Sequence, residues 1–183
     1  MAESATADLL LETYGPEERL VRYARDRIVI DPGAFWPRII SARAALDVER
    51  LDEAHEHALV ALGREPHAVW PHLLLAYIAL ARDDGATLLA EAEAAERINP
   101  DHLEPVVLKA VALARSGDRQ QAQAIIDGMD AAGHLQYHLQ HPVGHPMERA
   151  VNAVVAAGVI IPVAAPDLGP VVPSTHQHHG HHR

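Results

Sequence analysis

Histidine is the side chain in this sequence with the clearest capacity for chemistry. The chain of 183 residues holds 14 histidines and no cysteine, which excludes thiolate nucleophiles, disulfides and cysteine zinc sites. Neutral imidazole is a common ligand of Zn, Ni, Co and Cu. Three histidines spaced i, i+4 and i+7 would share one face of a helix. The candidate metal ligands are His134, His138, His141 and His145, followed by His176, His178, His179, His181 and His182 at the end of the chain.

Each histidine group also has a plainer interpretation. The first group could be the polar surface of a helix that caps the fold. The second group could be an inert tail or a cloning tag, and His-rich tracts bind metal by composition alone. A metal-handling protein for Ni, Zn, Co or Cu therefore stays open as an alternative function.

The remaining motifs do not predict an enzyme. Asp52-Glu53-Ala54-His55 spells the DEAH box of RNA helicases, but the phosphate-binding loop G-x-x-x-x-G-K-[ST] that such a motor needs is missing. The patterns G-x-G-x-x-G, G-x-S-x-G and H-E-x-x-H are missing too. No nucleophile and base can be paired by spacing. We therefore expect a non-catalytic protein without a dedicated cofactor.

Composition and charge limit the classes of partner that the protein is expected to bind. The sequence has 25 acidic and 15 basic residues, a formal net charge of −10, which argues against a broad nucleic-acid surface. The most apolar stretch, 150–165, is interrupted by Gly158 and Pro162 and is shorter than the roughly 20 residues that cross a bilayer. The N-terminus is acidic and lacks a secretory signal pattern. We expect a cytoplasmic protein without membrane insertion.

The elements that position these side chains repeat every 34 residues. Asp31-Pro32, Glu65-Pro66 and Asn99-Pro100 share this spacing. A second set of prolines, Pro37, Pro71 and Pro105, and three further columns of positions repeat at the same interval. Each period predicts two helices, because proline suits a first helical turn and the residue before proline leaves the helical region. The columns are Trp36, Trp70 and Glu104; Ala42, Ala76 and Ala110; and Arg43, Tyr77 and Val111. The predicted helices span 5–13, 17–30, 37–48, 51–63, 70–81, 86–98, 105–115, 119–129 and 146–157.

These units resemble the tetratricopeptide repeat. Trp70-x2-Leu73-Leu74-x2-Tyr77 is similar to the first-helix pattern of that family, and Gly117-Asp118 to its turn between helices. The resemblance covers roughly residues 1–136 and implies an all-α, right-handed solenoid of about four helix hairpins. A His-containing capping-helix region is expected at 137–160, with the apolar residues of its helix, Val155 among them, buried. A flexible Pro/His-rich tail is expected at 161–183.

In this family the first helices line a concave groove that binds a peptide or a helix of a partner. By resemblance, the groove residues here are Trp36, Ile39, Arg43, Trp70, Leu73, Tyr77 and Val107, although the aliphatic ones also suit a packed core. The Lys/Asn/Arg clamp that holds chaperone C-termini is absent, which disfavours chaperone tails as ligands. We expect a cytoplasmic adaptor or chaperone-like scaffold for a protein partner, with a homo-oligomer or a regulatory domain of a larger assembly as further options.

Overall fold

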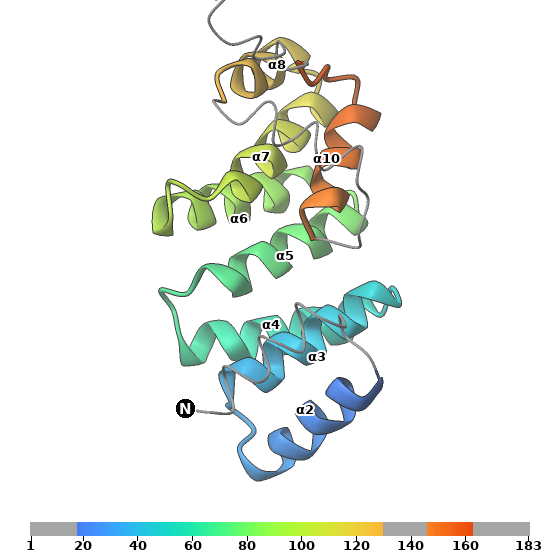
Figure 1. Ribbon diagram of the computed structural model, residues 1–183, viewed down its shortest axis with the longest axis vertical. Coiled ribbons are helices and arrows are strands. Elements are labelled where there is room, and N and C mark those ends of the chain that lie inside the picture. The colour runs from blue at the N-terminus through green and yellow to red at the C-terminus, as the bar shows by residue number, and fades with distance from the viewer. Residues whose placement is uncertain (1–17, 130–145, 163–183) are drawn as a thin grey trace, which may run out of the picture.

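The chain forms an all-α structure in residues 18–129 and 146–162, the ranges that this computed structural model describes (Figure 1). The observed helices match the predicted ones to within two residues at each end. The predicted helix at 5–13 lies outside the described residues. The helices are α2 (Glu18–Ile30), α3 (Phe35–Asp47), α4 (Leu51–Arg64), α5 (Val69–Ala81), α6 (Gly85–Ile98), α7 (Leu103–Arg115), α8 (Arg119–Asp127) and α10 (Pro146–Ala156).

The turn inside each hairpin recurs every 34 residues. Glu49, Asp83 and Gly117 have positive φ angles of 59°, 56° and 101°. In each turn the next residue donates its N–H to a carbonyl five residues back, as Asp84 does to Ala79 at 2.9 Å. This left-handed ending satisfies carbonyl groups in the last turn of the first helix of each hairpin, which have no hydrogen-bond donor within the helix. The turns predicted between these helices are confirmed.

The turns between hairpins repeat at the same interval. Ala34, Ala68 and His102 donate their N–H groups to the carbonyls of Asp31, Glu65 and Asn99, at 3.0, 3.2 and 3.1 Å, respectively. The proline that follows each acceptor cannot continue the helix. The 34-residue period of the sequence is therefore also a period of backbone hydrogen bonds.

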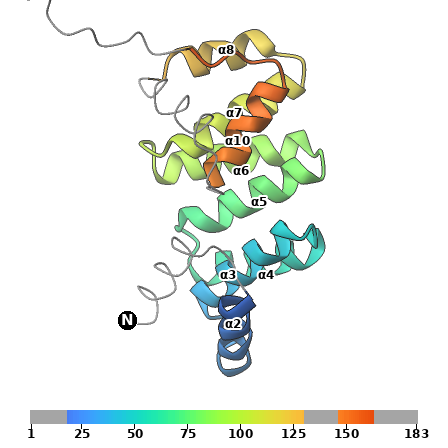
Figure 2. The ribbon, with the colours of Figure 1, turned by 45° about the vertical axis from the view of Figure 1, so that its right-hand side comes forward.

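Successive helices pack side by side and form an elongated row from α2 to α8 (Figure 2). Small side chains lie where helices cross, which allows the helix axes to approach closely. On α4, the alanines at positions 54, 58 and 61 are all fully buried. The core is therefore a long ribbon of apolar side chains between neighbouring helices.

Helix α10 lies beside this row. It packs against α7, and both ribbon views place it along the flank of the row at the level of α7 (Figures 1 and 2). The chain then passes α8, where the Gln123 side chain exchanges two hydrogen bonds with the backbone of Ile160, at 2.7 and 2.9 Å. The predicted helix is thus confirmed. Val155, however, was expected on its apolar face and is 43% exposed. This expectation was wrong, because consecutive residues of a helix point in different directions and Val154 is the one that faces the core.

Candidate functional site

The predicted groove residues divide into a buried and a partly exposed set. Trp36 and Arg43 on α3 are half-buried, and Trp70 at the start of α5 is 36% exposed. The ring of Trp36 stands edge-on to Phe35, with ring centroids 5.1 Å apart. The other four residues belong to the core and offer no exposed surface to an incoming ligand. They are Ile39, Leu73, Tyr77 and Val107, each at most 5% exposed.

Tyr77 and Glu104 form a buried polar contact at the centre of this region. The Tyr77 hydroxyl, on α5, donates a hydrogen bond to a carboxylate oxygen of Glu104 in the first turn of α7. Glu104 is 3% exposed, and its other oxygen lies 3.5 Å from His102 Nε2. A buried carboxylate is costly unless donors satisfy it. The tyrosine hydroxyl therefore stabilises Glu104 inside the core.

Burial raises the pKa of Tyr77 well above its ordinary value of 10. The negative charge of Glu104 and the hydrogen bond to it act in the same direction, whereas the positive charges of Arg149 and Arg43 act against them. Tyr77 is therefore a neutral donor throughout the physiological pH range. Two arginines from different helices, α3 and α10, act on one tyrosine of α5.

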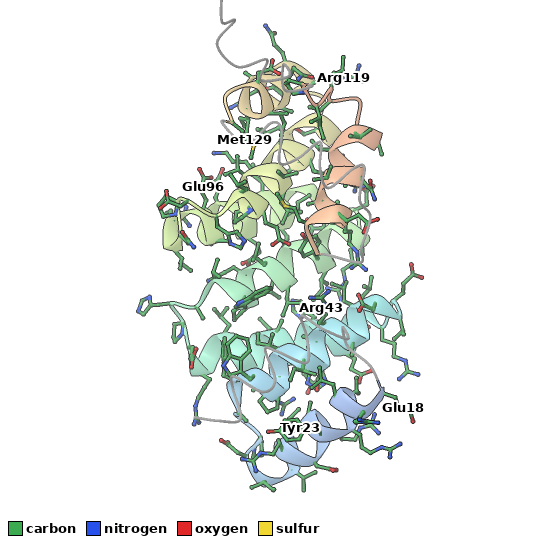
Figure 3. All side chains as sticks on the ribbon, viewed as in Figure 1. Glu18, Tyr23, Arg43, Glu96, Arg119 and Met129 are labelled. Carbon is green, nitrogen blue, oxygen red and sulfur yellow. The ribbon has the colours of Figure 1, made fainter. Side chains whose placement is uncertain are left out.

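Arg149 connects α10 to two helices of the row. Its guanidinium lies 6.0 Å from the centroid of the Tyr77 ring, within the range of a cation–π contact. Its Nη2 is 3.3 Å from Oδ1 of Asp47 on α3. Arg43 lies one turn before Asp47, and Figure 3 labels it on α3. Helix α10 thus makes specific polar contacts with α3 and α5 in addition to its packing on α7.

We call this surface the α10 face. It comprises the side of α5 and α7 that α10 covers, with Arg43 and Asp47 of α3 at one end and Arg119 and Gln123 of α8 at the other. At the α8 end, Gly158 approaches the Arg119 guanidinium so closely that an added Cβ would lie 3.1 Å from it. Gly158 also has a φ of 90°, a conformation that suits glycine.

Helix α10 is amphipathic and presents a short apolar stripe to this face. The stripe consists of Met147, Ala150, Val151 and Val154, with exposed fractions of 5, 0, 0 and 0%. Asn152 and Val155 lie on the exposed side. An isolated helix of 11 residues is marginal in water. The helicity of α10 therefore depends on its packing against the row.

A small pocket opens on the other side of α5. It has a volume of 140 Å³ and lies between α4, α5 and α6, where His72 Nδ1 contacts Glu91 Oε2 at 2.7 Å. Pockets for drug-sized ligands begin at roughly 300 Å³. The lining contains His55 of the DEAH letters, but Asp52 and Glu53 lie outside it, in the first turn of α4. This pocket is too small to be the main binding site.

The metal prediction falls on residues that the structure does not describe. All nine candidate histidines lie within 130–145 or 163–183. In residues 18–129 and 146–162, no three His, Asp or Glu side chains gather as a metal site would require. Metal binding by the C-terminal histidines stays a prediction.

No helix within the described ranges has the length and apolar character that a bilayer crossing requires. Comparisons with family models, with curated proteins and with solved structures found no match to this chain. The likeness to the tetratricopeptide repeat therefore remains a resemblance carried by the sequence motifs. The sequence prediction missed Asp47 and Glu104 of the row, and Arg149 of α10, as site residues. The presence of Glu104 in the tryptophan column was the one signal that pointed to any of them.

Proposed function

We propose that this protein is a non-catalytic interaction module with a tetratricopeptide-like, right-handed solenoid, which holds a helical segment of a partner protein on its α10 face. The observation that supports this most is the seating of α10 itself. An amphipathic helix lies on this surface with its apolar stripe buried and its arginine paired. A surface that accepts one such helix has the shape and chemistry to accept another.

The polar groups of the α10 face favour recognition over chemistry. Tyr77 and Glu104 satisfy each other inside the core, and Asp47 pairs with an arginine. Such groups fix the register of a docked helix, while the apolar stripe supplies the binding free energy. In this proposal the protein acts in the cytoplasm as an adaptor or chaperone-like scaffold.

A photo-crosslinking amino acid at Trp70 tests this proposal. With 3.6 residues per turn, Trp70 and Tyr77 lie on the same side of α5, whereas Leu75 and Ala79, which line the small pocket, point away from it. Leu59 of α4 lines that pocket and is 46% exposed, so it is the matched control position. We expect irradiation in cells of the source organism to attach one defined helical segment of a partner at position 70 and not at position 59.

Mass spectrometry of the crosslinked peptide identifies the segment, and fluorescence anisotropy then measures the affinity of a synthetic copy. Equal capture at both positions, or capture of extended segments without helical propensity, contradicts the proposal.

A further inference from the structure

The position of α10 differs from that of every other described helix. From α3 to α8, each helix packs against the one before it in the sequence. Helix α10 instead turns back onto α7 and reaches α3 through Arg149. It lies along the flank of the row, across helices of successive hairpins (Figure 1). Within the described residues, α10 thus packs across the row and not on the helix before it.

The contacts of α10 define a short pattern. Met147, Arg149, Ala150, Val151 and Val154 give the order apolar, any, arginine, small, apolar, any, any, apolar. The small residue and the two valines are fully buried. The arginine contacts both an aromatic ring and a carboxylate, which a planar guanidinium serves better than a lysine ammonium.

We propose that α10 is an internal ligand that occupies the α10 face until a partner helix with the same pattern displaces it. This inference rests on the proposed function and adds two things to it. The first is the chemistry of the partner, which is an amphipathic helix with a small apolar stripe and one arginine beside it. The second is the regulation of binding: a chain whose α10 is docked binds the partner more weakly than a chain whose α10 is released.

The probe for this proposal is a fluorescent peptide with the wild-type sequence of residues 146–162. Full-length chains are compared by anisotropy. Val151→Asp places a charge at a fully buried position and releases α10. Val155→Asp makes the same change at an exposed position of the same helix and keeps it docked. We expect the peptide to bind the first variant at least tenfold more tightly than the second variant or the wild-type chain.

A charge exchange tests the arginine without disturbing the core. Asp47 and Arg149 are both partly exposed, so their substitution leaves the row folded. In the full-length Asp47→Arg chain, Arg149 faces a like charge, which weakens the docking of α10. We expect this chain to bind a peptide carrying Arg149→Glu about threefold more tightly than the wild-type peptide, the scale of a partly exposed ion pair, and the Val151→Asp chain to show the reverse preference.

Two results would overturn the proposal. One is peptide binding that is equally weak in all chains although circular dichroism shows the row of Val151→Asp to be folded; α10 would then be a permanent part of the fold. The other is binding that ignores the charge exchange. Crosslinking separates these outcomes from the proposed function, because Trp70 is 36% exposed with α10 in place. Capture of a helical segment at position 70 by a chain whose α10 stays docked would keep partner binding on this side of α5 and overturn only the displacement of α10, whereas absence of capture would overturn the proposed function.

Discussion

At the scale of single residues, Glu104 is the one buried charged side chain in the described part of the chain. The tryptophan column of the repeat holds Trp36, Trp70 and then Glu104, so the sequence marks position 104 as different. Its burial could not be predicted, because it depends on a hydroxyl that α5 brings into contact with the first turn of α7. A repeat pattern shows which positions are equivalent, but it does not show which pairs of them meet.

Removing the Tyr77 hydroxyl leaves Glu104 without this donor. We expect Tyr77→Phe to lower the free energy of unfolding by about 1 to 3 kcal/mol, the usual cost of an unsatisfied buried polar group. Tyr23→Phe is the matched control, since Tyr23 is only half-buried at the edge of α2, and its effect should stay within about 0.5 kcal/mol. Urea unfolding measures both. Equal effects of the two substitutions would contradict the role of this hydrogen bond.

The raised pKa of Tyr77 fixes the sign of its pH dependence. Because the folded chain holds the phenol proton more tightly than the unfolded chain, the stabilisation is complete below pH 10 and is lost as the pH rises through the pKa of the folded state. The wild-type chain should therefore lose more stability than Tyr77→Phe between pH 9 and pH 11.

At the scale of the elements, the sequence predicted the helices well because their ends are local. Proline after Asp31, Glu65 and Asn99 ends each second helix, and the side chains of Asp84 and Asp118 cap the next helices by accepting N–H groups from Thr87 and Gln121. The positive φ values at Glu49 and Asp83 were not predictable from residue type, since neither residue is glycine. Their equivalence with Gly117, at steps of 34 residues, is what identifies them.

Gly117 and Gly63 make a matched pair for this turn geometry. Gly117 has a φ of 101°, whereas Gly63 lies inside α4, and a Cβ added at either one meets no atom within 4 Å. We expect Gly117→Ala to lower the free energy of unfolding by about 1 kcal/mol, because of the left-handed backbone. Gly63→Ala should raise it by about 0.5 to 1 kcal/mol, because alanine favours the helix. The midpoints of urea unfolding measure both effects, provided that the dependence of the unfolding free energy on urea concentration keeps the same slope. Effects of the same sign would contradict the assignment of a left-handed backbone to Gly117.

At the scale of the whole molecule, the row of hairpins follows from its period, because each hairpin buries its apolar stripe against its neighbours. The location of α10 does not follow. Its apolar spacing predicts which side is buried, and three of the four buried positions are Ala or Val, residues that fit many surfaces. The buried side was predicted apart from Val155, whereas its partner α7 and the contacts of Arg149 emerge only from the three-dimensional packing.

Amide hydrogen exchange of the wild-type chain, followed by mass spectrometry, tests the central claim most directly, because it measures whether α10 opens separately from the row. If α10 is an internal ligand, amides in residues 147–156 exchange through an opening that leaves α5 and α7 protected. An excess of the wild-type 146–162 peptide then speeds exchange in α10 of the chain, because the peptide takes its place, and keeps α7 protected. Exchange of α10 together with α5 and α7, in a single cooperative unfolding that the peptide does not change, would contradict the claim.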